Sequence, residues 1–475
     1  MRPAKYYRLL LSAMIVDFFS GPKPFLQKVA VKLDREVQER GFKLPVPFEI
    51  IPRTGVPDTT SPKDFGDPIF PSGERRPSGT VRVLYLVNSA QPYTVSGYTV
   101  RTQKLLHEAM QSEVTVYPAT RVGYPATIGV VPKGDSVCVD GINYFLLLPS
   151  RMSLWRNKNR REAIELLTEI ARQLDITLLH TTTDFRNASL ISEVARTLGI
   201  PWVYEVRGER DKTLELENSG QSSREFLAEF RRRETQAMQA ASAVVVLSEV
   251  SRRRVEDRGV PKDNIYVVPN GFDLNEAIEA PTREFAREKI GIPSSTKLIG
   301  TITSVVDYEG LDSLILALEI LDEDTKALIV GSGSALPALK QLAEKRGVAD
   351  RVVFAGKQDP RAIPLWCAAL DVFVLPRRDY EVCRAVTPLK PMLAMGMKIP
   401  VVASDLPAVR EATGGLALYV PPDDPEALSD AIREVLADPH NFYSKRLETF
   451  LATRTWQASA QRLIEAYEEI ISPEV

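Results

Sequence analysis

A loop rich in basic residues lies between two apolar segments in the last quarter of the chain. The apolar run 371–376 (D-V-F-V-L-P) predicts a buried strand, and a second apolar run follows at 400–403. The loop leads into a segment of small residues that predicts a helix, and its basic residues are Arg377, Arg378, Arg384 and Lys390. A loop at the carboxyl end of a parallel strand is where α/β proteins commonly hold phosphate. The pattern therefore predicts a phosphate site, with a solvated basic surface loop as the alternative.

Two polar residues stand at the ends of neighbouring predicted strands in the first half of the chain. His180 ends the apolar run 177–180, and Arg207 follows the run 202–206. The carboxyl ends of parallel strands meet at one edge of a sheet, so both side chains are expected at the same edge of a cleft. For His180 a structural role remains open. His107 and His440 are interpreted as structural.

A loop at 88–102 follows the first predicted strand and leads into a helix. Gly97 within it would let the backbone approach a ligand just before the helix begins. The alternative is an ordinary strand-to-helix turn. A second glycine pair, at 331–333, is a weak dinucleotide signal because Leu336 stands where the third glycine would be.

The composition describes a globular protein with no strong electrostatic preference. The chain has 475 residues, 44 % hydrophobic and 26 % charged, which is enough for about two to three domains. A net charge of −2 provides no general footprint for nucleic acid. The three cysteines and three histidines form no metal-binding pattern. The cysteine usage fits a reducing cytosolic compartment, and no metal site is expected.

Apolar runs alternate with helical segments along two successive stretches of the chain, which predicts two parallel sheets with crossover helices. The first set of strands is expected at 81–87, 114–117, 177–180, 202–206 and 243–247. The second set is expected at 297–301, 326–330, 351–354, 372–375 and 401–403. The final helix, 456–471, stands apart from the second set.

The N-terminal region has a different character. Residues 1–44 predict a helical extension in two stretches, the second of which, 25–40, has one apolar and one charged face. Prolines recur through 45–78, which predicts a linker or a strap on a surface. The apolar run 9–20 follows basic residues and is too short to span a bilayer. It is expected to be an amphipathic helix docked on protein, a membrane-surface helix, or a disordered lead.

Three motifs together resemble a known family. They are G-Y-T-V-R-T at 97–102, L-G-I-P-W-V-Y-E-V-R-G at 198–208 and V-T-P-L-K-P at 386–391. The chain is similar in them to the family-4 retaining glycosyltransferases of the GT-B superfamily. The resemblance implies an α/β fold of two doubly wound, Rossmann-like domains that face a cleft. It implies an acceptor-side domain at 79–283, a donor-side domain at 284–453 and a helix at 454–475 that crosses back to the first domain.

The resemblance also implies roles for individual residues. His180 and Arg207 would be the catalytic residues. The donor would be bound by Gly97, Ser304, Lys357, Arg377, Arg384, Pro388, Leu389, Lys390 and Leu393. The acceptor side would carry Tyr98, Arg101 and Arg121. A nucleotide-diphosphate sugar would be the co-substrate, with no further cofactor and no metal. Residues 1–44 would contact a membrane surface or a protein, and the location would be cytoplasmic or peripheral at the inner face of the membrane.

The chain departs from the family pattern at positions that bear on activity. Most members carry glutamates where this chain has Ala385 and Leu393, and many carry a lysine where it has Glu309. A leucine side chain cannot accept a hydrogen bond from a ribose hydroxyl. An active enzyme would transfer a sugar, with retention, to a cell-surface glycan, a lipid or a small molecule. The alternatives are a GT-B pseudoenzyme that binds or assembles with another transferase, and another GT-B activity such as an epimerase or a phosphorylase.

Overall fold

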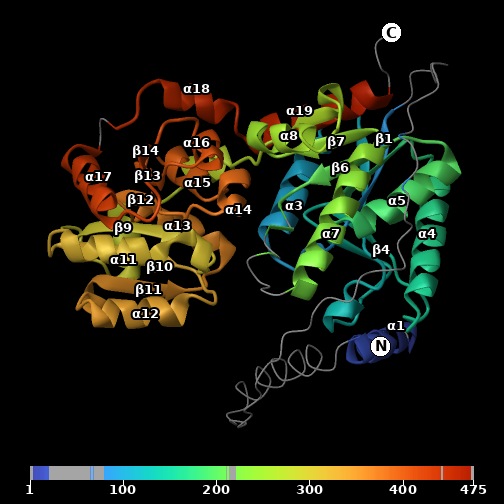
Figure 1. The fold of residues 1–475 in the computed structure, drawn as a ribbon, viewed down its shortest axis with the longest axis horizontal. Coiled ribbons are helices and arrows are strands. Elements are labelled where there is room, and N and C mark those ends of the chain that lie inside the picture. The colour runs from blue at the N-terminus through green and yellow to red at the C-terminus, as the bar shows by residue number, and fades with distance from the viewer. Residues whose placement is uncertain are drawn as a thin grey trace. The chain divides into compact units, whose positions relative to one another are not determined.

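The chain forms two compact units in the computed structural model, which describes residues 4–20, 65, 68, 80–209, 211–212, 215, 221–439 and 442–471. The first unit is built from the chain up to Val245, from Val255–Tyr266 and from the segment that begins at Leu463. The second unit comprises Val246–Arg254 and Val267–Arg462. Figure 1 shows the helices and strands of both. The predicted helix 25–40 and nearly all of the predicted linker 45–78 lie outside the described residues.

The sheet of the first unit has eight strands in the order β3-β4-β2-β1-β5-β6-β7-β8. The strands are β1 (Arg82–Val87), β2 (Thr115–Thr120), β3 (Ser136–Val139), β4 (Ile142–Leu146), β5 (Leu178–Thr182), β6 (Trp202–Val206), β7 (Ala243–Val246) and β8 (Ile265–Val267). Strand β1 pairs in parallel with both β2 and β5. Every residue of β5 and β6 is buried, as is typical of parallel strands covered on both faces.

The edge of this sheet differs from the prediction of parallel strands alone. Strands β3 and β4 form an antiparallel hairpin that the apolar runs did not reveal. Asp140 and Gly141 make its turn, with φ angles of 46° and 82°. Two successive positive φ angles are characteristic of the tight turns that Asp-Gly pairs favour in hairpins. The Asp-Gly pair of the turn was therefore the sequence signal for this hairpin, and the hydrophobic pattern of the strands was not.

Helices cover the first sheet. The helices of this unit include α3 (Gly97–Ala109), α4 (Arg156–Gln173), α5 (Phe185–Leu198) and α7 (Gln221–Ala240). Helix α5 packs against α4, α7 and strand β5, whereas α3 packs against β2 and β4. Helix α19 (Trp456–Ile471) follows at the C-terminal end of the described chain, and its part from Leu463 onward belongs to this unit.

The sheet of the second unit has six strands in the order β11-β10-β9-β12-β13-β14, and its pairs are parallel. The strands are β9 (Lys297–Ile302), β10 (Thr325–Val330), β11 (Val352–Gly356), β12 (Val372–Leu375), β13 (Val401–Ser404) and β14 (Leu418–Val420). Alternate side chains of one strand enter separate cores, because successive residues point to opposite faces. Val372 and Val374 lie in one core, and Phe373 and Leu375 lie in the other.

Helices form both layers over the second sheet. One core is closed by α11 (Leu311–Ile320), α12 (Leu336–Lys345) and α17 (Pro425–Ala437). The other is closed by shorter helices, α9 (Leu274–Ile278), α10 (Arg283–Ile290), α13 (Ile363–Ala368), α14 (Glu381–Ala385), α15 (Pro391–Gly396), α16 (Pro407–Ala412) and α18 (Arg446–Ala452). The predicted pair of doubly wound parallel sheets is confirmed.

Each sheet has one point where the strand order reverses. In the first sheet this point lies between β1 and β5, and in the second it lies between β9 and β12. In doubly wound folds, ligands bind outside the carboxyl ends of the strands at this point. The strand order alone therefore predicts two ligand-binding positions, one at each reversal point.

The N-terminal helix α1 (Ala4–Ser20) packs on the first unit. Leu9 and Ala13 form an apolar cluster with Ala126 of the short helix η1 (Ala126–Ile128). Lys5 forms an ion pair of 2.7 Å with Asp135. The arrangement is that of a helix docked on protein by one face. No helix among the described residues is long and apolar enough to cross a membrane.

Candidate functional site

A pocket of about 260 Å³ opens at the carboxyl edge of the first sheet, at its reversal point. Its walls come from the ends of β1, β5 and β6 and from the start of α3. Hydroxyl and amide side chains dominate the lining, through Asn88, Ser89, Ser96, Thr102, Thr182 and Thr183, with Asp184 and Arg207 beside them. Such a lining can hydrogen-bond a small polyhydroxylated ligand.

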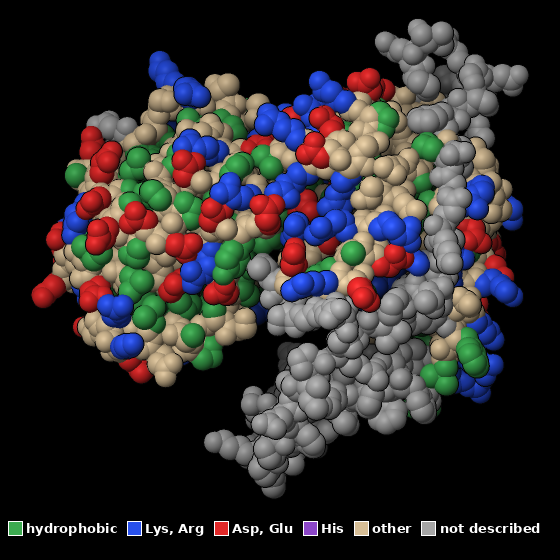
Figure 2. All heavy atoms as spheres, in the orientation of Figure 1, with side chains coloured by type: hydrophobic (Ala, Val, Ile, Leu, Met, Phe, Trp, Pro, Cys, Tyr) green, Lys and Arg blue, Asp and Glu red, His purple; other side chains and the backbone are tan. Residues whose placement is uncertain are grey.

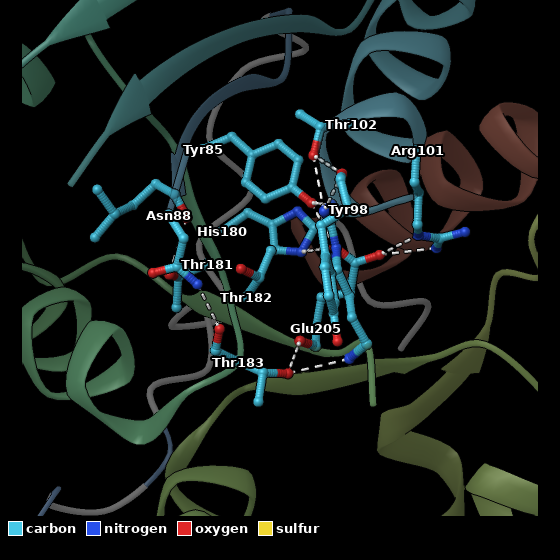
Figure 3. Close-up of polar contacts among 12 residues, drawn as sticks. Tyr85, Asn88, Tyr98, Arg101, Thr102, His180, Thr181, Thr182, Thr183 and Glu205 are labelled. Atoms are coloured by element: carbon cyan, nitrogen blue, oxygen red, sulfur yellow. Dashed lines mark hydrogen bonds and ion pairs between the residues drawn. The ribbon is translucent and has the colours of Figure 1, made fainter. Parts of the chain in front are cut away.

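Glu205 is the centre of a buried polar network beside this pocket (Figure 3). One carboxylate oxygen lies 2.7 Å from Nη2 of Arg101, and the other accepts from Nε of Arg207 at 2.7 Å. The Tyr85 hydroxyl also donates to it. Burial alone would raise the pKa of Glu205, but the charges of Arg207 and Arg101 outweigh burial and hold the pKa far below its usual range. The carboxylate therefore stays ionised and keeps both arginines in place.

Arg207 connects this network to the pocket. Its Nη1 donates to the Thr102 hydroxyl at 2.8 Å and to the Tyr98 carbonyl at 2.9 Å. These bonds fasten the first turns of α3 to the end of β6. Arg207 therefore lines the pocket with a side chain whose position is set by buried partners.

His180 lies deeper than the pocket. Its imidazole is fully buried and stacks on Tyr85, with ring centroids 4.0 Å apart. Nδ1 lies 2.5 Å from the Tyr467 hydroxyl of α19, and Nε2 lies 3.8 Å from Glu205. Burial lowers the pKa of His180 to about 3, so the ring is neutral at pH 7. The position on β5 that lines the pocket is Thr182, two residues further along the strand.

The remaining predicted residues of this unit fall into two groups. Gly97 begins α3, directly after the cap formed by Ser96. Tyr98 is 56 % exposed and lines the pocket. Arg121 is exposed at the end of β2, whereas Arg101 is buried against Glu205 and points away from solvent. The structure thus brings Tyr98 and Arg207 to the pocket and places Arg101 and His180 behind it.

The second unit carries a cationic cluster at the reversal point of its own sheet. Nζ of Lys390 lies 2.5 Å from Glu309 and also donates to the hydroxyl of Thr303, which follows β9. Nη2 of Arg377, which comes after β12, lies 3.1 Å from the same carboxylate oxygen of Glu309. These three charged residues and Thr303 are named the phosphate cluster below.

Close backbone contacts hold this cluster together. Gly310, with a φ of +65°, lies so near the end of β12 that a Cβ atom would stand 1.9 Å from the Pro376 carbonyl oxygen. A side chain at this position would push the two segments apart. The glycine therefore keeps Glu309 within reach of Arg377.

Charge within the cluster is partly balanced. Burial would raise the pKa of Glu309, but Arg377 and Lys390 outweigh it and lower the pKa. Burial lowers the pKa of Lys390 to about 8, and Glu309 offsets only part of this effect. Two cations and one carboxylate leave the group with a net charge of about +1 at neutral pH.

The other predicted phosphate-binding bases already have carboxylate partners. Arg384 lies 2.6 Å from Asp379, and Arg378 lies 2.7 Å from Asp312. Both pairs are partly exposed. Exposed ion pairs contribute little energy and exchange readily with solvent, so these bases are weaker candidates than Arg377, which is buried, and Lys390, which is partly buried.

The rest of the predicted donor residues surround the cluster less closely. Ser304 is exposed next to Thr303, and Pro388 and Leu389 precede Lys390 in the same loop. Leu393 is half-buried and packs against one core of the unit. Lys357 is exposed after β11, which the sheet order places two strands from β9.

Several residues at these sites escaped the sequence prediction, among them the pocket-lining Thr182 and Thr183. Glu205 could have been found, because it stands two residues before Arg207 on a strand and therefore on the same face. Thr303 was overlooked beside Ser304. Tyr85 and Tyr467 left no local signal, since they are contributed by elements far away in the chain. Within the described part of the chain, no group of three or more His, Cys, Asp or Glu is placed to hold a metal ion.

Both halves of the chain match family models. Residues 96–271 match the model "Glycosyl transferase 4-like domain", and residues 296–438 match "Glycosyl transferases group 1". The chain is 29 % identical over 252 residues to D-inositol 3-phosphate glycosyltransferase of Xylanimonas cellulosilytica, a match that covers 48 % of this chain and 57 % of the relative. The chain spans about half the length of the first curated relatives it matches.

Solved structures share the fold at low identity. Sucrose-phosphate synthase of Thermosynechococcus elongatus superposes with a TM-score of 0.64 at 18 % identity, covering 83 % of this chain and 100 % of that one. Anabaena Alr3699/HepE in complex with UDP superposes with a TM-score of 0.60 at 18 % identity, covering 82 % and 100 %. With the two family models in chain order on its two doubly wound units, the chain belongs to the group 1, or family-4, glycosyltransferases and has their GT-B fold.

Proposed function

We propose that this protein is a retaining glycosyltransferase that moves a sugar from a nucleotide-diphosphate donor to a hydroxylated acceptor. The observation that carries the proposal is the position of the polar groups. A hydroxyl-lined pocket lies at the reversal point of the first sheet, and the phosphate cluster lies at the reversal point of the second. The donor side is assigned to 284–453 and the acceptor side to 79–283, with 454–475 returning to the first domain.

The phosphate cluster supplies what the leaving group needs. Negative charge develops on the diphosphate as the glycosidic bond breaks, and fixed cations stabilise it without reorganising. Lys390 and Arg377 are held in place by Glu309 and can take this part. A neighbour of the same fold, HepE, was solved with UDP and with UDP-glucose, which favours a uridine nucleotide as the first donor to test.

The pocket of the first unit is assigned to the sugar and its acceptor. Thr182, Thr183 and Asn88 can hydrogen-bond hydroxyl groups there, while Arg207 keeps one wall in place. Arg207, in the wall of the pocket, and His180, behind that wall, are proposed as the catalytic residues. Tyr98 and Arg121 are assigned to the acceptor side. The acceptor is a cell-surface glycan, a lipid or a small molecule, reached from the cytoplasm or at the inner face of the membrane.

A pseudoenzyme that binds another transferase is the second candidate. It is favoured by the absence of carboxylates at Ala385 and Leu393 and by the carboxylate of Glu309, which already pairs with both Arg377 and Lys390. Such a protein would keep the fold and lose turnover.

Nucleotide binding and turnover separate the two candidates. Thermal-shift measurements with UDP, GDP, ADP and their glucose conjugates should show stabilisation by one nucleotide family. NMR of the product, or of slow donor hydrolysis, should then show that the anomeric configuration is retained. Stabilisation by a nucleotide together with no release of sugar from any donor would favour the pseudoenzyme. Inversion of the anomeric centre would contradict the proposal.

A further inference from the structure

Three large apolar side chains are exposed together at one end of the first unit. Trp155 is 78 % exposed, Leu11 is 61 % exposed and Leu154 is 54 % exposed. Single exposed apolar residues are ordinary on protein surfaces. A nearly bare tryptophan that follows one exposed leucine, with another on the helix bonded to the same loop, is less common, because grouped apolar surface usually marks a binding site.

These side chains come from segments that are bonded to each other. Ser12 of α1 accepts a hydrogen bond of 2.8 Å from the backbone N–H of Met152. Ser153 is fastened in turn to Asn159 of α4 by two bonds, of 2.7 and 2.8 Å. The loop that carries Leu154 and Trp155 is therefore tied to both helices, and its apolar side chains are presented from a fixed base.

Exposed basic side chains lie on the same segments as the apolar group. Arg8, Arg151, Lys158 and Arg161 are exposed on α1, on the loop and on the first turns of α4. Lys5 lies on the same helix but is paired with Asp135. Figure 2 shows hydrophobic and basic side chains close together at the lower right, at the end of the unit where α4 begins in Figure 1. Leu11, Leu154 and Trp155, with Arg8, Arg151, Lys158 and Arg161, are called the tip surface.

We propose that the tip surface docks on an anionic phospholipid bilayer. Tryptophan and leucine side chains enter the headgroup region, where an amphipathic indole is well accommodated. The surrounding Lys and Arg side chains then face the negative surface potential of the lipids. A nucleic acid would use the basic residues but would gain nothing from exposed leucines. The chain as a whole has a net charge of −2, so the attraction is local to this surface.

This docking is independent of the phosphate cluster and goes beyond the transfer reaction. It would place the pocket-bearing unit at a membrane, where a lipid or membrane-linked acceptor is at high local concentration. Helix α1 would act by its exposed face while its other face stays packed on Ala126.

Sedimentation of the full chain with vesicles tests the proposal. Vesicles of phosphatidylcholine with one quarter phosphatidylglycerol should bind the protein, and pure phosphatidylcholine should bind it at least about tenfold more weakly. Raising the salt from 0.1 M to 0.5 M should weaken binding because the attraction is screened. Trp155 should also shift its fluorescence to shorter wavelength on binding, and Trp155→Phe should remove that shift.

Two pairs of variants separate the apolar and the charged contributions. Leu154→Ser with Trp155→Ser, and separately Arg151→Glu with Lys158→Glu, should each weaken binding by about tenfold or more. Ile278→Ser, at a site that is 71 % exposed in the second unit, and Lys345→Glu, at an exposed site on α12, are the matched controls and should bind as the parent does. All sites are exposed, so folding should be unaffected, and thermal unfolding checks this.

Three outcomes would overturn the proposal. They are equal binding to neutral and anionic vesicles, equal binding by the parent and both double variants, and no vesicle binding at all. Dimerisation that is lost in the Leu154→Ser, Trp155→Ser variant would instead assign the surface to a second copy of the chain. Nucleotide-induced thermal stabilisation is measured without vesicles, so failure here leaves the proposed transfer reaction intact.

Discussion

Glu309 is the single carboxylate among the side chains that define the phosphate cluster. It lies between Lys390 and Arg377, the two cations of that cluster. A carboxylate there keeps the cations ordered while no ligand is bound, since unpaired buried charges are costly. It also lowers the net positive charge of the cluster. The same residue therefore stabilises the site and weakens it for anions.

Replacing Lys390 by Ala should weaken UDP binding about tenfold, because one charge-assisted contact is lost. Isothermal calorimetry measures the change. Lys345→Ala, on the exposed end of α12, is the control and should bind UDP as the parent does. Equal affinity in Lys390→Ala and in Lys345→Ala would remove the phosphate cluster from the donor site.

Glu309→Gln should have the opposite effect. The amide keeps the shape of the side chain and removes its charge, so the net charge of the cluster rises by one and UDP should bind several-fold more tightly. Asp379→Asn provides a matched control beside Arg384, where exposure screens the effect. Weaker binding by Glu309→Gln would mean that ordering of the two cations matters more than net charge.

With Leu393 in place, the site should discriminate poorly between nucleotides that carry ribose and those that carry 2′-deoxyribose. An apolar side chain cannot reject an analogue that lacks a hydroxyl, so UDP and 2′-deoxy-UDP should differ by less than about tenfold in affinity. Leu393→Glu should widen the difference. Competition calorimetry with both nucleotides measures the ratio of the two affinities. A strong preference for UDP in the parent would show that another residue binds the ribose.

Helix α19 links the C-terminal end of the described chain to the pocket-bearing sheet. Its Tyr467 reaches the imidazole of His180 across 287 residues of sequence. The Tyr467 hydroxyl hydrogen-bonds Nδ1 of the imidazole, and the imidazole stacks on the ring of Tyr85. One helix thereby helps to hold a residue on β5 in place.

Tyr467→Phe should remove the hydrogen bond between the tyrosine hydroxyl and the His180 imidazole. Loss of one buried hydrogen bond should lower the free energy of unfolding by about 1 kcal/mol. Tyr443→Phe loses a bond to the Ile399 carbonyl in the second unit and should cost a similar amount. Only Tyr467→Phe should alter the nitrogen-15 chemical shifts of His180 and lower turnover. Identical spectra and turnover in the two variants would leave Tyr467 a purely structural residue.

At the scale of the whole molecule, the buried ionisable groups make stability depend on pH. Burial lowers the pKa of His180 to about 3, against an ordinary value of 6.5. Between these values the unfolded state binds a proton that the folded state does not, so stability decreases as the pH falls below 6.5. Burial raises the pKa of Glu234 to about 8, which contributes with the opposite sign as the pH rises.

His180→Phe should therefore flatten the acid side of the stability profile. Between pH 7 and pH 5 the parent should lose roughly 2 kcal/mol through this one residue, and the variant should not. Urea unfolding at both pH values measures the difference, and comparing the two proteins cancels the contribution of Glu234. His107→Phe, at an exposed site on α3, is the control for the substitution itself. The same pH slope in parent and His180→Phe would contradict the assignment of a neutral buried ring.

The sequence by itself determined the elements and their order. Apolar runs located most strands of both sheets, because a parallel strand buried on both faces must be continuously apolar. Crossover rules then implied two parallel sheets, and the motifs placed Arg207, Arg377 and Lys390 near strand ends. All of these signals are local, because each depends on the hydrophobic periodicity or the residue motif of one short segment.

Only the tertiary structure decided which of these residues meet. Glu309 pairs with Lys390 across 81 residues, and Glu205 pairs with Arg101 across 104. Such pairs depend on sheet order, on close approaches such as that of Gly310, and on the helix that returns from the C-terminal segment. No single segment encodes them, because each results from many weak contacts made elsewhere in the fold. For that reason the sequence named the cations of the phosphate cluster, and only the fold revealed the carboxylate that holds them.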